Sequence, residues 1–538
     1  MTKFLTFALY SIYIGILNTY YIHCAVPTFG FDGIILRYLS RGLQSTFIYL
    51  SLLIVIKNIF GKKKNNLKFF LLPLFFIYIL LPELTFLIEK LYFLESAQWE
   101  ELAYLFMQTN PSEANEAVGI GRPILITLIL MSSFLIHLKI FKSLDIVLPN
   151  KYTIGLTLLV LCSFLLPEIN KSIFPNRFGL YSTSYFKHYL SEIDRVTNLN
   201  DNIRENIKKR TLEVSHRGSK DEKKNFVLII GESLTKKRMS LYNYKKVHTN
   251  PKLSKRKLIK FENSYSNHVW TVKALSLALT EANQYNQLDY FSANTIVDLA
   301  NRSDIKTHWY SNQSTHGRMN AMITVIAKDA DNTRFSIENT TGVSEFQDSV
   351  LLDMMSEDIK NKVLSNNDAN LIVVHLIGNH FLYCNRFPND FMPELKASSH
   401  EECYDKSVLF NDKVVDDIIK KLSKFSGKTP LGVFYFSDHG INFDEDSDLG
   451  ESKRMVSNYK PAMAEIPVLF WANDPYNKKY PEIIKNLKKN KNKVYTNDLV
   501  FNTLAGLLNL KYGEESFDVT SKDFKISSPL TNHGKHKL

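Results

Sequence analysis

The segment Val433–Asn442, VFYFSDHGIN, carries the strongest fold signal in this chain of 538 residues. Its first four residues favour β-structure, and Asp438 and His439 follow them almost directly. An acid at the end of a strand commonly forms a turn or caps a helix. Alternatively, the strand delivers two metal ligands to the edge of a sheet, and the surrounding sequence must distinguish these interpretations.

Similar apolar runs recur before and after this segment and alternate with helical patterns. The runs are NFVLIIGES at 225–233, IKTHWYSNQ at 305–313, ANLIVVHLIGNH at 369–380, LGVFYFSDHG at 431–440 and EIPVLFWAND at 465–474; the helical patterns span 271–282, 346–364, 404–424 and 496–508. Continuous apolar strands separated by helices predict an α/β domain with a mostly parallel sheet sandwiched by helices. In such sheets, ligands bind beyond the carboxyl ends of the strands.

Several strands place reactive side chains at that edge. Glu232 ends the first run, His380 ends the third, and Asp438 and His439 follow the fourth strand. Carboxylates and imidazoles are the ligands of zinc, so these residues predict a catalytic zinc site with an open position. Thr271 begins a helical pattern. It is either an ordinary N-cap or a nucleophile at a helix N-terminus, where a phosphate is stabilised.

The first 170 residues or so have a different composition from the rest. Their apolar runs fall at 4–25, 44–60, 68–90, 123–141 and 153–169, and most approach the roughly 20 residues that cross a bilayer. Lysines gather around the second–third and fourth–fifth junctions, whereas glutamates fill the loop between the third and fourth runs. The positive-inside rule then predicts five crossings with the carboxyl end outside. A cleaved signal peptide is the alternative for the first run, and a transporter for the whole region, although its runs carry few of the charges that transport requires.

These patterns predict three regions. Residues 1–170 form a five-helix transmembrane domain, 171–222 an interfacial and helical linker, and 223–538 the catalytic domain. The topology places Cys384 and Cys403 in an oxidising compartment, where we expect a disulfide between them.

The net charge of +12 arises from 66 basic and 54 acidic side chains. Lysine- and asparagine-rich patches such as KNLKKNKNKVY at 485–495 reflect either a biased genome or attraction to anionic headgroups and sugar phosphates. We expect no nucleic acid partner for a domain outside the membrane.

Several motifs together resemble a known family. They are GESLTKKRMSLYNYKKVHTNP at 231–251, TVKALSLALT at 271–280, YSNQSTHGRMNAMITV at 310–325, VVHLIGNH at 373–380 and FYFSDHG at 434–440. The chain resembles the bacterial phosphoethanolamine transferases of the alkaline phosphatase/sulfatase superfamily, most closely the branch that modifies heptose in the lipopolysaccharide core.

This resemblance implies a ping-pong phosphotransferase. Phosphatidylethanolamine would donate phosphoethanolamine to Thr271 and leave as diacylglycerol, and a lipopolysaccharide acceptor, core heptose before lipid A, would then receive the group. The residues that match the zinc site are Glu232, Thr271, Asp438 and His439. The implied location is the bacterial inner membrane, multi-pass, with the catalytic domain in the periplasm, and a monomer is expected.

Further residues match less specific parts of the family pattern. His380 matches a histidine that contacts the phosphate or a second zinc, and Thr109 and Glu113, in QTNPSEA, match a substrate-contacting helix. His316 and Arg318 either contact the donor phosphate or are surface residues.

The chain also departs from the family pattern. Ile441 stands where many relatives have an acid, and the next histidine is His533, so a second zinc is left open. The alternatives are a phosphoglycerol or other headgroup transferase, a hydrolase and a non-catalytic membrane scaffold. A sulfatase-type nucleophile is disfavoured because WTVKAL at 270–275 lacks the C/S-x-P-x-R pattern.

Overall fold

The computed structural model describes most of residues 212–537, with gaps at 221, 287, 314–320, 337–346, 381, 443–460, 527–529 and 532–535, and scattered residues between 51 and 158. The elements described below belong to one compact unit of the chain, which we describe by itself. Most of the five apolar runs between residues 4 and 169 lie outside the described residues. Within the described part, none of the helices combines the length and the apolar character that crossing a bilayer demands.

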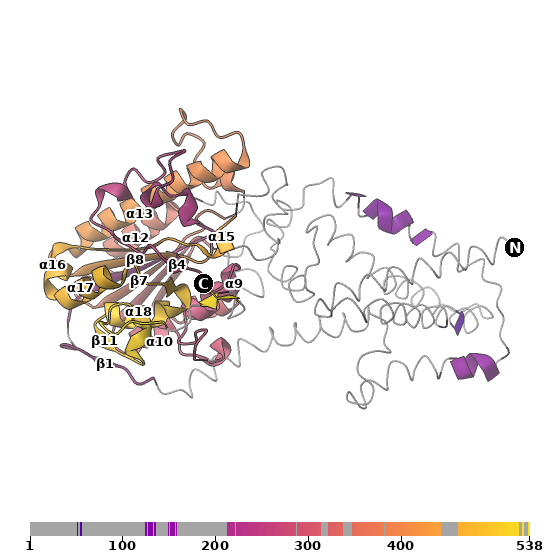
Figure 1. Cartoon of the computed structure of the whole chain (residues 1–538), viewed down its shortest axis with the longest axis horizontal. Helices are drawn as coiled ribbons and strands as arrows, with labels where there is room; N and C mark the ends of the chain where they lie inside the picture. Colours follow the sequence, from indigo (N-terminus) through magenta and orange to yellow (C-terminus); the bar gives the residue numbers. More distant parts are fainter. Residues whose placement is uncertain are drawn as a thin grey trace. The chain divides into compact units, whose positions relative to one another are not determined.

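A seven-stranded mixed sheet forms the centre of this unit (Figure 1). Its strand order is β3-β9-β8-β2-β7-β5-β6. Its strands are β2 (Asn225–Gly231), β3 (Ile259–Lys260), β5 (Lys306–Ser311), β6 (Asn332–Phe335), β7 (Asn370–His375), β8 (Leu431–Ser437) and β9 (Val468–Ala472). Neighbouring strands from β8 to β6 are parallel. The strand β9 runs antiparallel to β8, and β3 runs antiparallel to β9. The five apolar runs between residues 225 and 474 therefore all form strands, and the last of them, β9, is antiparallel to the others.

The three central strands end level with one another. Every residue of β2, β7 and β8 is buried, which explains why their sequences are apolar throughout rather than alternating. Ile230 is paired with His375 on one side and with Phe436 on the other. Whatever follows these strands is consequently delivered to the same place.

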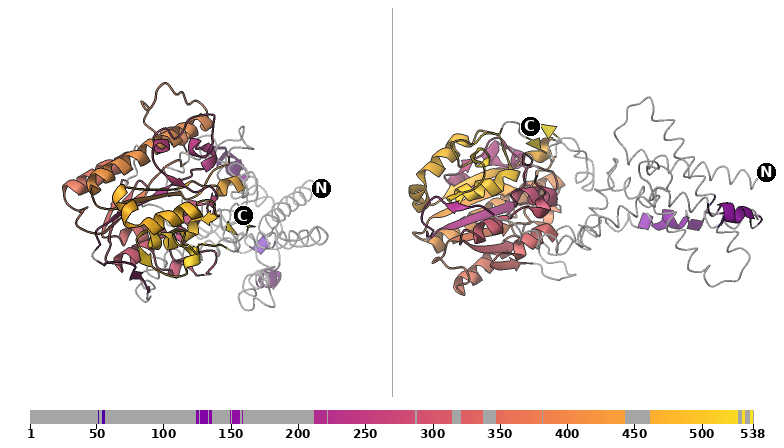
Figure 2. Two further views of the ribbon diagram at one scale, coloured as in Figure 1. Left: turned by 60° about the vertical axis from the view of Figure 1, so that its left-hand side comes forward. Right: turned by 90° about the horizontal axis from the view of Figure 1, so that it is seen from below.

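Helices cover both faces of the sheet, as Figures 1 and 2 show. On one face lie α12 (Val350–Lys360) and α13 (His400–Ser426), whose apolar side chains share a core cluster with Val227, Val374 and Val433. The helices α10 (Ile296–Asn301), α16 (Asp474–Lys479), α17 (Pro481–Asn490) and α18 (Val500–Leu507) belong to the other side. There the ring of Tyr476 in α16 lies 6.4 Å from that of Phe226 in β2.

The remaining elements are short. They are α9 (Thr271–Ala278), α11 (Ala321–Lys328), α15 (Pro461–Ala464), the 3-10 helices η3 (Lys236–Arg238), η4 (Ser240–Tyr242), η5 (Leu253–Lys255), η6 (Tyr290–Ser292), η7 (Tyr383–Asn385), η8 (Asn497–Leu499) and η9 (Glu515–Phe517), and the paired strands β1 (Ser215–His216) with β11 (Leu510–Lys511), β4 (Ser264–Tyr265) with β10 (Tyr495–Thr496) and β12 (Leu530–Thr531) with β13 (His536–Lys537). A disulfide between Cys384 and Cys403 joins η7 to the first turn of α13.

Candidate metal centre

Three potential metal ligands meet just beyond the carboxyl ends of β2 and β8. One ligand atom from each of Glu232, Asp438 and His439 lies within 4.8 Å of the other two. His439 Nε2 lies 3.6 Å from Glu232 Oε1 and 3.4 Å from Asp438 Oδ2. The two carboxylates are almost completely buried, and the imidazole is largely so.

Backbone hydrogen bonds interlock the two segments that carry these ligands. Asp438 Oδ1 accepts from the N–H groups of Ser233 and His439, at 2.8 and 2.6 Å. The N–H of Leu234 donates to Ser437 Oγ at 2.9 Å. One carboxylate oxygen of Asp438 thus stabilises the turn, as acids at strand ends often do. Its other oxygen lies toward Glu232 and His439.

The turn after Glu232 requires unusual backbone conformations. Ser233 has a φ of 54°, in the left-handed region that non-glycine residues seldom occupy. Gly378, in the loop after β7, has a φ of 51°, and a Cβ on it would lie 2.9 Å from the backbone nitrogen of Glu232. The N–H of Asn379 donates to the carbonyl of Glu232 at 2.9 Å. This loop therefore packs directly against the backbone that presents Glu232.

Thr271 lies beside two of these ligands. Its Oγ1 lies 3.2 Å from both carboxylate oxygens of Glu232 and 3.3 Å from His439 Nε2. Thr271 is the first residue of α9, whose N-cap is Trp270, so the N-cap interpretation of Thr271 is wrong. The first N–H groups of a helix have no partner within it, and they favour a negatively charged group near the Thr271 hydroxyl.

The electrostatics of this cluster favour a cation. Burial, and then the nearby charge of Asp438, raise the pKa of Glu232 well above its usual range. Asp438 Oδ2 is buried and has no hydrogen-bond partner among the described residues. Two buried carboxylates with an imidazole and a hydroxyl are a ligand set that suits zinc. The residues present therefore fit a zinc ion, with Asp438 Oδ2 as an oxygen that no hydrogen bond from the described residues satisfies.

Two further histidines lie close to this centre. His380 is half-buried after β7, and burial, the Arg386 guanidinium and His439 lower its pKa to about 3. His375, the last residue of β7, is buried with neither ring nitrogen hydrogen-bonded within the described part of the chain. Burial lowers the pKa of His375 to about 4, so both side chains are neutral near pH 7.

Four predicted substrate-binding residues, Thr109, Glu113, His316 and Arg318, lie outside the described residues. The sequence interpretation missed Ser233 and Gly378, which shape the turn. A local sequence motif would not have identified them, because their positive φ angles depend on the packing of distant segments. The glycine in VVHLIGNH was the available signal, since an isolated glycine after a strand often marks a close approach of backbones.

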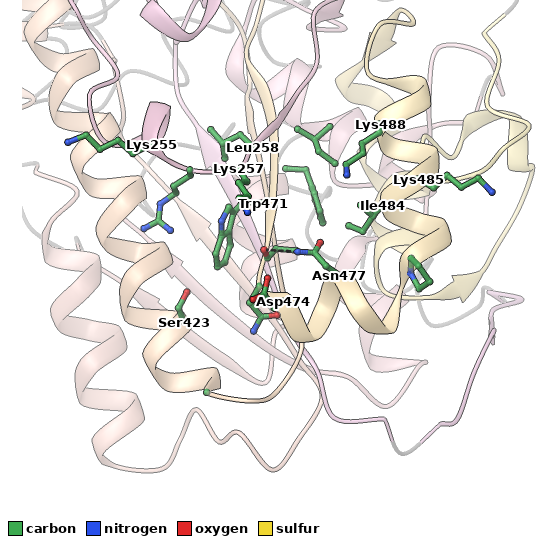
Figure 3. Close-up of a pocket in the computed structure, with 17 residues that line it drawn as sticks. Lys255, Lys257, Leu258, Ser423, Trp471, Asp474, Asn477, Ile484, Lys485 and Lys488 are labelled. Carbon is green, nitrogen blue, oxygen red and sulfur yellow. Dashed lines mark hydrogen bonds between the residues drawn. The ribbon is translucent and has the colours of Figure 1, made fainter.

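A separate hollow lies elsewhere on this unit. A groove of about 1200 Å³ runs between the end of α13, β9 and α17 (Figure 3). Its lining includes the apolar side chains of Trp471 and Ile484. The charged side chains that line it are Lys255, Arg256, Lys257, Lys485, Lys488 and Asp474. Ala472, which lines it, pairs with Gly432 at the beginning of β8. The groove is thus at the opposite end of β8 from Asp438 and is separate from the metal centre.

A hydroxyl beside buried carboxylates and an imidazole, at the carboxyl edge of an α/β sheet, is an arrangement that can bind a metal ion and activate the hydroxyl as a nucleophile. The chain belongs to the sulfatase family, whose model matches residues 224–510, more than half of the chain.

Individual relatives are more specific. The chain is 28% identical over 358 residues to phosphoethanolamine transferase EptC of Escherichia coli, an alignment that covers 63% of this chain and 59% of EptC. It is 25% identical to phosphoethanolamine transferase CptA of Salmonella typhimurium, covering 64% of this chain and 61% of CptA. The chain therefore spans less than two thirds of the length of these relatives.

Solved structures agree at the level of the fold. The zinc complex of the periplasmic domain of E. coli EptC is 26% identical, with a TM-score of 0.52, and the match covers 59% of this chain and 91% of that domain. The integral membrane protein EptA of Neisseria meningitidis has a TM-score of 0.61 over 96% of this chain and 98% of its own. At 17% identity the likeness to EptA concerns the fold alone.

Proposed function

We propose that this protein transfers phosphoethanolamine from phosphatidylethanolamine to a lipopolysaccharide acceptor through a phosphothreonine intermediate on Thr271. Core heptose is the favoured acceptor, followed by lipid A. The observation that carries the proposal is the position of Thr271 Oγ1, 3.2 Å from Glu232 and 3.3 Å from His439 at the start of α9. The similarity to proteins named phosphoethanolamine transferase supports the choice of transferred group.

The proposed zinc ligands are Glu232, Asp438 and His439, together with Thr271. A bound zinc ion would lower the pKa of the threonine hydroxyl and offset negative charge on the phosphoryl oxygens. One zinc is proposed, and a second remains open because the chain has Ile441 where many relatives have an acid.

The chain's own groups account for the two transfers. In the first, the Thr271 Oγ1–phosphorus bond forms, the phosphorus–oxygen bond to diacylglycerol breaks, and the leaving oxygen takes a proton. Glu232 Oε2 lies 3.2 Å from Oγ1 and is near enough to take the proton that Oγ1 loses. In the second transfer, an acceptor hydroxyl attacks phosphorus and Thr271 is regenerated. Phosphoryl transfer of this kind depends mainly on positioning and charge neutralisation.

Substrate contacts and location belong to the same proposal. His380 would contact the phosphate, and Thr109, Glu113, His316 and Arg318 are further candidates. Residues 1–170 would anchor the enzyme in the bacterial inner membrane, 171–222 would connect, and 223–538 would act in the periplasm as part of a monomer. This arrangement would hold the zinc site next to its lipid donor.

The test uses the full chain in lipid vesicles. The vesicles contain phosphatidylethanolamine or phosphatidylglycerol with a labelled headgroup, and mass spectrometry of tryptic peptides follows Thr271. We expect a phosphoethanolamine adduct on Thr271, and release of diacylglycerol, only with phosphatidylethanolamine. An adduct from phosphatidylglycerol instead would replace the donor, and no adduct from either lipid would reject the intermediate.

The acceptor is tested in cells. Lipopolysaccharide from strains with and without the gene is compared by fragmentation mass spectrometry. A phosphoethanolamine increment on core heptose is expected. An increment on lipid A would move the proposed acceptor, and identical lipopolysaccharide in both strains would contradict it.

A further inference from the structure

We propose that one face of α13, formed by Tyr404 and Ser407, positions Glu232 for metal binding. These are positioning residues, because they act on Glu232 through backbone atoms and do not belong to the ligand set. The inference rests on the proposed function in one respect, that Glu232 is a zinc ligand.

Tyr404 holds the turn that follows Glu232. Its side chain is completely buried. The hydroxyl donates to the carbonyl of Ser233 at 2.7 Å and accepts from the N–H of Thr235 at 3.0 Å. Ser233 and Thr235 are themselves buried, so the hydroxyl satisfies two backbone groups that water does not reach. Removing it would leave both groups without this partner, which is costly in a buried turn.

Ser407 acts on the preceding peptide indirectly, through Asn379. Its Oγ donates to the carbonyl of Tyr404 at 2.7 Å and accepts from Asn379 Nδ2 at 2.6 Å. The N–H of Asn379 in turn donates to the carbonyl of Glu232 at 2.9 Å. Because residues three apart lie on the same face of a helix, one turn of α13 binds the Ser233 carbonyl directly and supports the Glu232 carbonyl through Asn379.

This bracing is needed because the turn is strained. A non-glycine residue in the left-handed region costs free energy and persists only where the surroundings enforce it, and Ser233 has a φ of 54°. The Ser233 N–H also binds Asp438 Oδ1. If Ser233 relaxed, both carboxylates of the metal centre would move. The α13 face therefore keeps Glu232 and Asp438 together before any metal arrives.

The disulfide lies beside this face. Cys403 precedes Tyr404 in the chain, and Cys384 follows Tyr383. The rings of Tyr383 and Tyr404 pack edge to face at 4.9 Å. The covalent link thus keeps Tyr383 against the ring of Tyr404 and restricts how far Tyr404 can move.

The experiment compares Tyr404→Phe with a matched control in the full-length protein. The control is Tyr476→Phe, which also removes a buried hydroxyl that donates to a backbone carbonyl, that of Leu507, at 2.7 Å. Zinc affinity is measured by competition with a chromogenic chelator. We expect Tyr404→Phe to bind zinc about ten- to hundredfold more weakly, the usual range for residues that orient metal ligands. Excess zinc should restore its Thr271 labelling, and Tyr476→Phe should bind zinc like the wild type.

A second variant protects the test against misfolding. If Tyr404→Phe shows no cooperative melting transition, Ser407→Ala decides, because it removes only the hydroxyl that holds Asn379. We expect a zinc affinity that is several-fold weaker than that of Tyr476→Phe. Equal affinity in the folded variants and the control would overturn the inference.

The inference and the proposed function can fail separately. If the wild type binds zinc but never labels Thr271, the proposed function fails, and the zinc comparison between variants still judges the role of α13. If Tyr404→Phe and Ser407→Ala bind zinc like the wild type while Thr271 is labelled normally, only the role of α13 is rejected.

Discussion

The metal centre and the groove lie at opposite ends of β8 and differ in almost every physical property. The centre is small and acidic, and its carboxylates are buried. The groove is large and mainly basic, and its lysines are exposed. At the centre, Asp438 Oδ2 has no hydrogen-bond partner within the described part of the chain, whereas none of the described groove residues has a buried polar atom in that condition.

This difference shows that a buried polar group without a hydrogen bond is a better indicator of a ligand-binding site than the volume of a groove. An exposed lysine is stabilised by water and needs no ligand. A buried carboxylate next to another carboxylate needs a cation, a proton or a strong donor to offset its cost. The metal centre therefore calls for a bound group, and the groove does not.

Thr271→Ala gives the largest effect that would sharpen this comparison. Since the variant lacks the oxygen that attacks phosphorus, we expect transfer to fall by a factor on the order of 10⁴ or more. Release of diacylglycerol from labelled lipid is the measurement. Thr280→Ala is the control, because Thr280 lies just beyond the same helix and its hydroxyl donates only to the carbonyl of Ser276. Normal transfer by Thr271→Ala would remove Thr271 from the mechanism.

Asp438→Asn compares the same substitution in both regions. At the metal centre it removes one of two buried negative charges, so zinc affinity should fall at least about 100-fold. Asp474→Asn, the equivalent change in the groove, should leave zinc affinity unchanged because Asp474 is exposed. Equal zinc affinities in the two variants would contradict the ligand assignment.

The two buried carboxylates, Glu232 and Asp438, predict that the stability of the metal-free protein depends on pH. Without metal, the raised pKa of Glu232 means that the folded state keeps a proton that the unfolded state releases above the usual value of 4.5. Stability is then lost as the pH rises from about 4.5 toward the folded pKa. Urea unfolding of the metal-free protein should show this loss, and Asp438→Asn should reduce it. A loss of equal size in Asp438→Asn would mean that Asp438 does not raise the pKa of Glu232.

Removal of the disulfide should have an intermediate effect. The double variant Cys384→Ala/Cys403→Ala opens a loop with a sequence separation of 19, and we expect a loss of about 3 kcal/mol in the free energy of unfolding. Reducing agent should lower the wild type to the same stability and leave the variant unchanged. A wild type that is insensitive to reduction would contradict a stabilising role for the crosslink.

The groove should give the smallest effect. Replacing Lys255, Lys257 and Lys488 with alanine should change the free energy of unfolding by no more than about 0.5 kcal/mol and leave the labelling of Thr271 within about twofold. Lys236→Ala is the contrast, because the buried Lys236 donates to the carbonyl of Glu262 at 2.8 Å, and we expect it to cost about 1–3 kcal/mol. A tenfold loss of labelling in the triple variant would break the comparison by linking the groove to the reaction.

The sheet was largely predictable because its strands are buried on both faces. The five apolar runs between residues 225 and 474 are all strands, and the helical patterns at 271–282 and 404–424 correspond to α9 and α13. The direction of β9 was not predictable, since an apolar run indicates burial and not orientation. The strands β3 and β6, of two and four residues, are too short to produce a pattern.

Within the candidate metal centre, only the residues whose own side chains would bind the ion could be predicted from the sequence. Asp438 and His439 follow a buried strand, which indicates their position directly. Tyr404 acts on the main-chain carbonyl of Ser233, 171 residues away, and Ser407 acts on Asn379, 28 residues away. Such contacts leave no spacing in the sequence, because any chain can supply a carbonyl oxygen.

The two oxygens of Asp438 would make the stability of the folded protein depend on the concentration of free zinc. One oxygen ties the Ser233 turn, and the other faces the place where the ion would bind, so occupancy and folding are thermodynamically linked. A hundredfold excess of free zinc over its dissociation constant would add about 2.7 kcal/mol to the native state. If zinc binds here as proposed, its removal would both leave the site without its ion and lower the stability of this domain.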